Sequence, residues 1–144
     1  IEKAVQQKQI EYLSNLLLGS LYAGFVINHT GTIVVHGMAY GMTIRYHFHH
    51  GTANAICLPY ALNFLKTHGY EDEIRDLEKI FSIDSLFEIN KKIGIPIHLR
   101  ELGIQREDVD ILAEMAVVGN ERAFRNMKIS ISREEFVEIF SNML

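Results

Sequence analysis

A long stretch almost without charge is the feature that most constrains how this chain folds. Between Leu13 and Leu65, Arg45 is the only Asp, Glu, Lys or Arg, whereas Lys66 to Leu144 contains 27 such residues. A helix that is apolar on every side must be covered on every side. Because a domain of about 150 residues buries only about 70% of the surface of its unfolded chain, we expect a further structure to cover the N-terminal third.

Three kinds of cover are compatible with such a stretch: a lipid bilayer, another domain of the same polypeptide, or another subunit. A bilayer requires about 20 mostly apolar residues per span. Polar residues such as Asn15, Ser20 and His36 interrupt the apolar runs 13–27 and 31–44, which also lack aromatic belts and basic flanks. We therefore expect no membrane, and we expect these helices to line an interior interface.

Composition limits the kinds of partner and the cellular compartment that we expect for this chain. A formal charge of -4 and a pI near 6.0 provide no basic stripe for a phosphate backbone, so we expect no nucleic-acid partner. The single cysteine, Cys57, cannot form an internal disulfide, which fits a cytoplasmic protein. The chain opens on Ile1 without a secretory leader. We expect residues 1–144 to form a single domain of a longer polypeptide.

Periodicity predicts an all-α fold, a multi-helix bundle. Few segments alternate with period two, and the only prolines are Pro59 and Pro96. Ser132 followed three residues later by Glu135 predicts a capping box at the start of the last helix. The pattern predicts helices over 3–28, 32–46, 51–67, 71–81, 84–93, 106–118 and 132–143.

Three glycines have predicted structural roles. Gly94 follows two lysines and is typical of a helix end, where cations lie at the negative end of the helix dipole. Gly37 and Gly41 lie one turn apart on the second predicted helix. Because neither carries a Cβ, we expect another backbone to approach that helix closely.

Histidines cluster in the charge-poor region, where five of the seven fall within 22 residues. His29, His47 and His68 lie near predicted helix ends, where a histidine is typically a polar or capping residue. His36 differs because it lies inside an otherwise apolar helix, where each ring nitrogen needs a partner. A metal ion is one such partner.

Geometry restricts which histidines could share an ion with His36. On one continuous helix His36 and His50 would be about 21 Å apart, whereas each imidazole nitrogen lies about 2.1 Å from a shared ion. The helix must therefore break, and Gly51 at the end of the run 48–51 favours a turn there. His47, His49 and His50 all remain candidates, and because a catalytic site takes at least three protein ligands, we expect the others from outside this stretch.

Three segments together resemble a known family. They are Leu-Gly-Ser-Leu-Tyr-Ala-Gly-Phe-Val-Ile-Asn at 18–28, Val-His-Gly-Met-Ala at 35–39 and His-Gly-Thr-Ala-Asn-Ala-Ile-Cys-Leu-Pro at 50–59. With the spacing of 14 between His36 and His50, they resemble the C-terminal helical domain of iron-containing (group III) alcohol dehydrogenases, which have a dehydroquinate synthase-like fold. The likeness continues through 94–96, 99–103 and 108–113 to the Ser132 helix.

The resemblance implies a metal site between two domains. His36 and His50 match two of three histidine ligands to Fe(2+) or Zn(2+), and the third histidine and an aspartate lie upstream in the family. An N-terminal dinucleotide-binding domain, absent from this chain, binds NAD or NADP. The resemblance thus implies hydride transfer between NAD(P) and a small alcohol or aldehyde substrate by a homo-oligomer, and an isolated fragment that is inactive.

The sequence departs from the family at three positions near this site. Tyr40 and Gly41 stand where many members have His and Pro, and His49 stands where Pro is usual. Because residues i and i+4 share a helix face, we expect Tyr40 to line the substrate pocket beside His36. The alternatives are a non-catalytic helical interaction module and a glycerol dehydrogenase-like or dehydroquinate synthase branch of the same superfamily.

Overall fold

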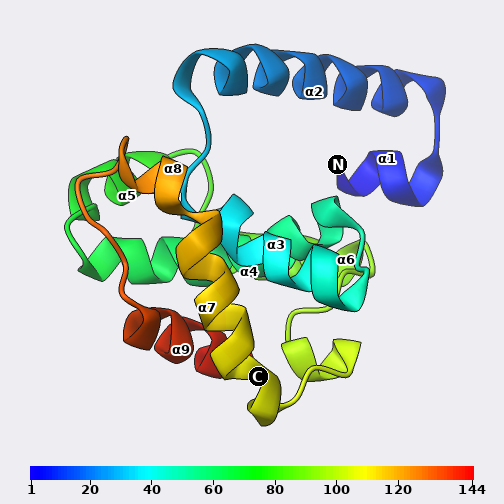
Figure 1. Ribbon diagram of the computed structural model, residues 1–144. Helices are drawn as coiled ribbons and strands as arrows, with labels where there is room; N and C mark the ends of the chain where they lie inside the picture. The colour runs from blue at the N-terminus through cyan, green and yellow to red at the C-terminus, as the bar shows by residue number, and fades with distance from the viewer. The chain divides into compact units, whose positions relative to one another are not determined.

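The computed structural model describes all of residues 1–144 and contains helices and no strands, which confirms the predicted all-α fold. By its contacts the chain divides into two compact units, residues 1–32 and 33–144. Its α-helices, labelled in Figure 1, are α1 (Glu2–Gln7), α2 (Ile10–Thr30), α3 (Val34–Tyr46), α4 (His50–Thr67), α5 (Glu71–Glu78), α6 (Ile83–Lys92), α7 (Val109–Gly119), α8 (Glu121–Phe124) and α9 (Arg133–Asn142). Two short 3₁₀ helices, η1 (Leu99–Leu102) and η2 (Arg106–Asp108), precede α7.

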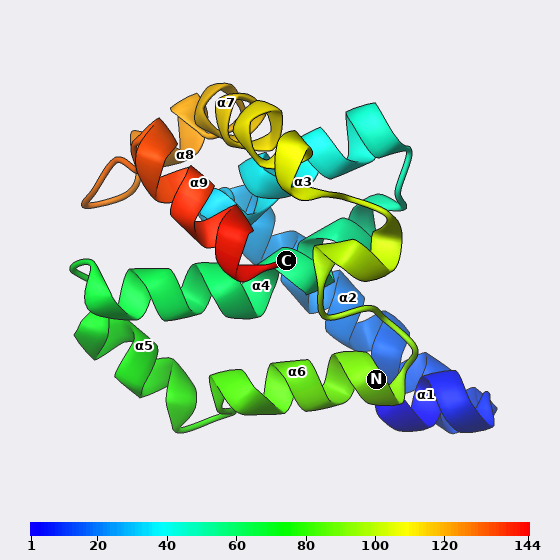
Figure 2. The same ribbon diagram turned by 90° about the horizontal axis from the view of Figure 1, so that it is seen from below.

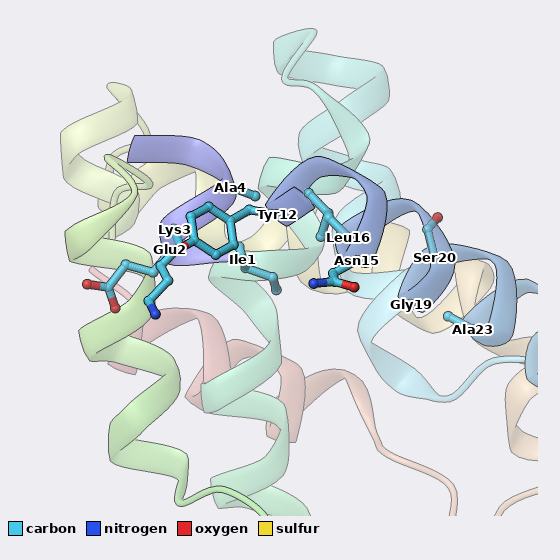
Figure 3. A pocket seen from close by; sticks show the side chains of 10 residues that line it. All are labelled: Ile1, Glu2, Lys3, Ala4, Tyr12, Asn15, Leu16, Gly19, Ser20 and Ala23. Carbon is cyan, nitrogen blue, oxygen red and sulfur yellow. The ribbon is translucent and has the colours of Figure 1, made fainter. Parts of the chain in front are cut away.

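Residues 1–32 form a helical hairpin of α1 and α2. The prediction of one helix over 3–28 is wrong, because Lys8 adopts the left-handed conformation at φ 52° and ends α1. The side chains of Lys3 and Tyr12 lie close together, with the ammonium nitrogen 5.4 Å from the centre of the ring. Figure 3 shows the hollow that the two helices enclose, lined by Ile1 and Ala4 on one side and by Tyr12, Leu16 and Ala23 on the other.

Helix α2 carries the apolar surface that the charge pattern predicts. It contains no buried residue, and large side chains such as Leu17 and Phe25 are exposed. By length and composition alone α2 is able to cross a membrane, a test that a core helix of a soluble protein also passes. The expectation that a protein surface covers α2, rather than a bilayer, stays a prediction.

Residues 33–144 pack around α4, which contacts α3, α5, α6 and α9. Figure 2 shows α3 and α9 on one side of α4 and α5 and α6 on the other. Helix α7 packs against both α3 and α9 and closes the core. Large fully buried side chains on these helices include Met38, Met42, Ile56, Leu112, Phe136 and Phe140.

The crossing of α3 and α7 is close because glycines line it. A Cβ atom on Gly37 would lie 2.2 Å from the amide carbon of Asn120, and one on Gly41 would lie 2.9 Å from a methyl group of Leu112. From the other side, a Cβ on Gly119 would lie 3.1 Å from the Cα of Gly37. The predicted close approach of another backbone is therefore confirmed at Gly37, whereas at Gly41 the near neighbours are side chains of α7.

A proline and an asparagine join α4 to α6. Pro59 lies inside α4 and has no N–H, which leaves the carbonyl of Ala55 without its helical donor. The buried side chain of Asn90 on α6 donates to this oxygen at 2.8 Å. The hydrogen bond that Pro59 removes from α4 is thus replaced by one from the neighbouring helix.

Helix ends elsewhere in this unit follow the sequence signals. The hydroxyl of Ser132 accepts from the backbone of Glu135, whose carboxylate accepts from the backbone of Ser132, so the predicted capping box is confirmed. Helix α6 ends after its two lysines, and Gly94 adopts φ 76° just beyond it, as predicted. The ends of α3, α4, α5, α7 and α9 lie within a few residues of those predicted, whereas α8 and η1 match no predicted helix.

The turn between α3 and α4 is made by a residue other than the one predicted. Gly51 is helical, in the first turn of α4, whereas His47 adopts the left-handed conformation at φ 57°. The backbone N–H groups of His47 and Phe48 both bond to the carbonyl of Met42, which closes the end of α3. This turn redirects the chain so that α4 begins at His50 beside α3.

Replacing His47 by glycine tests the strain at this turn. A left-handed residue with a Cβ costs about 1 kcal/mol, and glycine adopts this conformation without that cost. We expect His47→Gly to raise the free energy of unfolding by about 1 kcal/mol in urea denaturation, and His47→Ala, which keeps the Cβ, to bring no such gain. Equal stability of His47→Gly and the wild type would contradict this account of the turn.

Adding a methyl group to Gly37 tests the crossing of α3 and α7. The new Cβ would overlap the buried amide of Asn120, so we expect Gly37→Ala to lower the free energy of unfolding by about 1–3 kcal/mol. Gly19→Ala on α2, where nothing lies within 4 Å of the added atom, serves as the control and should be neutral or stabilising. The interpretation fails if both variants unfold at the urea concentration of the wild type.

Candidate metal centre

The fold brings His36 and His50 together although 14 positions separate them. His36 lies in the first turn of α3, and His50 is the first residue of α4. Their ring centres are 5.5 Å apart, and the ring planes meet at 62°. Both side chains are half-buried. This separation suits two imidazoles that bind one ion, and the assignment of both as ligands stays a prediction.

Tyr40 follows His36 by one helical turn and belongs to the same cluster. Its ring stacks on that of His50, with centres 5.6 Å apart and an interplanar angle of 17°. The side chain is 42% exposed, and its ring lies against Gly119 of α7. Tyr40 therefore lies beside the two histidines, as its predicted place in a substrate pocket requires.

Thr43 is a member of this cluster that the sequence analysis did not identify. Its hydroxyl donates to the carbonyl of Ala39 at 3.0 Å and lies 3.2 Å from Nδ1 of His50. The spacing of His36, Tyr40 and Thr43, at i, i+4 and i+7, places all three on one face of α3. That spacing is the signal from which Thr43 could have been found.

Asn54 supports the start of α4 directly after the cluster. Its side-chain amide donates to the carbonyl of His50 at 3.0 Å. The hydrogen bond fixes the backbone from which the His50 ring projects.

Burial and the neighbouring ring favour neutral His36. Burial is the larger of two causes that lower the pKa of His36 below its ordinary value of 6.5, and the charge of protonated His50 is the second. No protein group forms a hydrogen bond with either ring nitrogen of His36. A neutral imidazole with a free nitrogen is the form that binds a metal ion, so the donor chemistry of His36 fits a divalent cation.

The cluster by itself is too small to hold a catalytic ion. No group of three or more His, Cys, Asp or Glu side chains in residues 1–144 is arranged to bind a metal. Catalytic ions such as zinc take three protein ligands and keep an open position. Two imidazoles therefore provide part of a coordination shell.

The other histidines of the region lie apart from this pair. His47 and His49 are exposed in the turn before α4, so the structure selects His50 from the three candidates as the neighbour of His36. His29 and His68 lie at helix ends and bond through Nδ1 to the carbonyls of Phe25 and Phe64, as expected of capping residues. Both carbonyls belong to the helix that the histidine ends, and the ring of His68 also stacks on that of Phe64.

Cys57 is a core residue. It is fully buried and its thiol contacts the sulfur of Met42 at 3.7 Å. Burial raises the pKa of this thiol far above its usual range, so Cys57 is not a metal ligand or nucleophile in this fold.

Comparison with known proteins identifies the family. The profile described as Fe-containing alcohol dehydrogenase family, C-terminal, matches residues 1–144. The chain belongs to this family, and the resemblance of its sequence motifs is confirmed. The helical arrangement of this chain superposes on part of each of two solved structures of similar proteins.

Individual relatives agree with the family match. Lactaldehyde reductase of Escherichia coli (strain K12) is 31% identical over 71% of this chain and 30% of its own length. The 1,3-propanediol dehydrogenase of Citrobacter freundii is 30% identical over 88% of this chain and 36% of its own length. A solved structure of 1,3-propanediol oxidoreductase superposes with a TM-score of 0.72 at 30% identity, over 87% of this chain and 36% of that one. The chain thus spans about a third of the length of these relatives.

Titration of His36 tests the electrostatics of the pair. In the metal-free protein, NMR should show His36 losing its proton at a pH below 6.5. Removing the second charge in His50→Gln should move the pKa of His36 back upward. Since folding lowers this pKa, the stability linked to His36 is present above pH 6.5 and is lost as the pH falls through the lowered value. A pKa of His36 at or above 6.5 would contradict the described environment.

Proposed function

We propose that this chain is the metal-binding and substrate-cleft domain of an oxidoreductase that transfers hydride between NAD(P) and a small alcohol or aldehyde. The observation that carries the proposal is the meeting of His36 and His50, ring centres 5.5 Å apart, in a chain whose whole length matches the Fe-containing alcohol dehydrogenase family. The names of the relatives, a lactaldehyde reductase and 1,3-propanediol dehydrogenases, support a small alcohol or aldehyde as substrate.

His36 and His50 would hold Fe(2+) or Zn(2+), for which imidazole ligands are suited. When bound, such an ion supplies a Lewis acid that lowers the pKa of an alcohol hydroxyl or polarises an aldehyde carbonyl. The chain's own contribution is to favour neutral His36 and to hold both rings half-buried and close together. Helix α3 fixes His36 through its packing on α7, and the turn at His47 fixes the start of α4 and with it His50.

Tyr40 would border the substrate beside this pair. Its phenol is partly exposed and stacks on His50, so the hydroxyl is available to a ligand in the cleft. A neutral phenol donates or accepts a hydrogen bond but is a poor base. We assign Tyr40 to orientation of the substrate oxygen and not to proton abstraction.

The remaining ligands and the dinucleotide site would come from an N-terminal domain of the same polypeptide. Two features support this assignment: the cluster lacks a third ligand, and the chain spans only about a third of its relatives. The uncovered apolar side chains of α2 provide a surface for such a domain or for a second subunit of a homo-oligomer. On this view the isolated chain is inactive, and the complete protein works in the cytoplasm.

A non-catalytic interaction module explains the exposed helix α2 but leaves the histidine pair without a role. A glycerol dehydrogenase-like branch of the superfamily would retain a related metal cleft. The match to alcohol and diol dehydrogenases over most of the chain favours the alcohol dehydrogenase branch.

Substitution of the proposed ligands tests the function in the complete protein. We expect His50→Ala to weaken Zn(2+) binding at least about 100-fold and to abolish alcohol-dependent NAD(P) reduction, because loss of a direct ligand costs at least as much as loss of its supporting partner. His36→Ala should behave alike. Metal content by mass spectrometry and the rate with 1,3-propanediol are the readouts.

His49→Ala is the matched control, since it removes the neighbouring imidazole and should retain metal and rate. Circular dichroism should show the same helical content in all three variants. Full metal occupancy and an unchanged rate in His50→Ala would exclude the proposed site.

A further inference from the structure

The side chain of Thr43 links the two helices that carry the histidine pair. Thr43 lies on α3, and its hydroxyl oxygen contacts Nδ1 of His50 on α4 at 3.2 Å. The same oxygen lies 3.0 Å from the carbonyl oxygen of Ala39, one turn earlier on α3. Thr43 is half-buried, so bulk water competes weakly for either contact.

The two contacts of Thr43 determine where the proton of His50 lies. A threonine hydroxyl has one hydrogen and two acceptor lone pairs. The carbonyl of Ala39 only accepts, so the hydroxyl hydrogen is directed to it. The contact with His50 then requires the ring to be the donor, through an Nδ1–H group. In a neutral imidazole this leaves Nε2 unprotonated, with its lone pair free.

The orientation of the His50 ring is fixed by three further contacts. Tyr40 stacks on one face of the ring, and His36 meets it edge to face. Asn54 holds the backbone carbonyl of His50. Thr43 adds the polar contact that distinguishes one ring nitrogen from the other, which the two aromatic contacts do not.

We propose that Thr43 is a positioning residue that holds His50 in the Nδ1–H tautomer and so presents Nε2 as a ready metal ligand. The consequence for metal binding rests on the proposed function of the pair, whereas the tautomer itself does not. Ligand histidines in metal sites generally donate their second ring N–H to a protein group, which fixes the tautomer and raises the basicity of the ligand nitrogen. Here a side chain of the helix that carries one ligand would orient the other ligand.

The tautomer is measured directly in metal-free protein. The complete protein is labelled with ¹⁵N at its histidines and examined by NMR near pH 8, where ordinary imidazoles are neutral. We expect His50 to show a protonated Nδ1 and an unprotonated Nε2. Thr43→Val removes the hydroxyl at similar volume and should shift His50 toward the Nε2–H form. Thr43→Ser keeps the hydroxyl and should retain the wild-type tautomer.

Zinc binding measures how the tautomer of His50 affects metal affinity. Titration of the same three proteins with Zn(2+) should show affinity reduced about 10- to 100-fold in Thr43→Val and close to wild type in Thr43→Ser. If Thr43 had a purely structural role, substitution would alter the stability of the protein, but the valine and serine variants would not differ in zinc affinity. Circular dichroism of each variant establishes that the helices are intact.

The outcomes separate the two proposals. An unprotonated Nδ1 on His50 of the wild type overturns the role of Thr43, and so does a wild-type tautomer in Thr43→Val. If the tautomers behave as expected but His36 and His50 bind no zinc in any protein, the positioning of His50 by Thr43 stands and the proposed metal site fails.

Discussion

The left-handed turn at His47 is the constraint on which the candidate site depends. It ends α3 and starts α4 within three residues, so that two imidazoles 14 positions apart come within 5.5 Å, centre to centre. The turn is effective only because α3 is itself fixed, through the glycine contacts with Asn120 and Leu112 on the side of α7. Packing of the backbone thus determines the geometry of the pair before any ion is present.

The apolar side chains of the charge-poor region have two different surroundings. Helices α3 and α4 bury much of their surface in the core of residues 33–144, with Met38, Met42 and Ile56 fully enclosed. Helix α2 has no buried residue at all. In the proposed function, one neighbouring domain would both supply further metal ligands beside His36 and His50 and cover the exposed side chains of α2.

Sequence reasoning succeeded where short-range chemistry determines structure and failed where a left-handed residue decides it. The capping box at Ser132 and the close approach at Gly37 could be predicted because each depends on one residue type at one spacing. Lys8 has no local signal for positive φ, and histidine, although enriched there among non-glycine residues, is a weaker signal than the glycine at position 51. The contact of Thr43 with His50 joins two helices whose mutual placement only the tertiary fold supplies.

A crystal structure of the complete protein with Zn(2+), recorded at the zinc absorption edge, tests the central claim most directly. The account predicts one anomalous peak about 2.1 Å from a ring nitrogen of His36 and the same distance from a ring nitrogen of His50. A peak within bonding distance of only one of the two rings would contradict the account. So would zinc at another place, with both rings bonded to other protein groups.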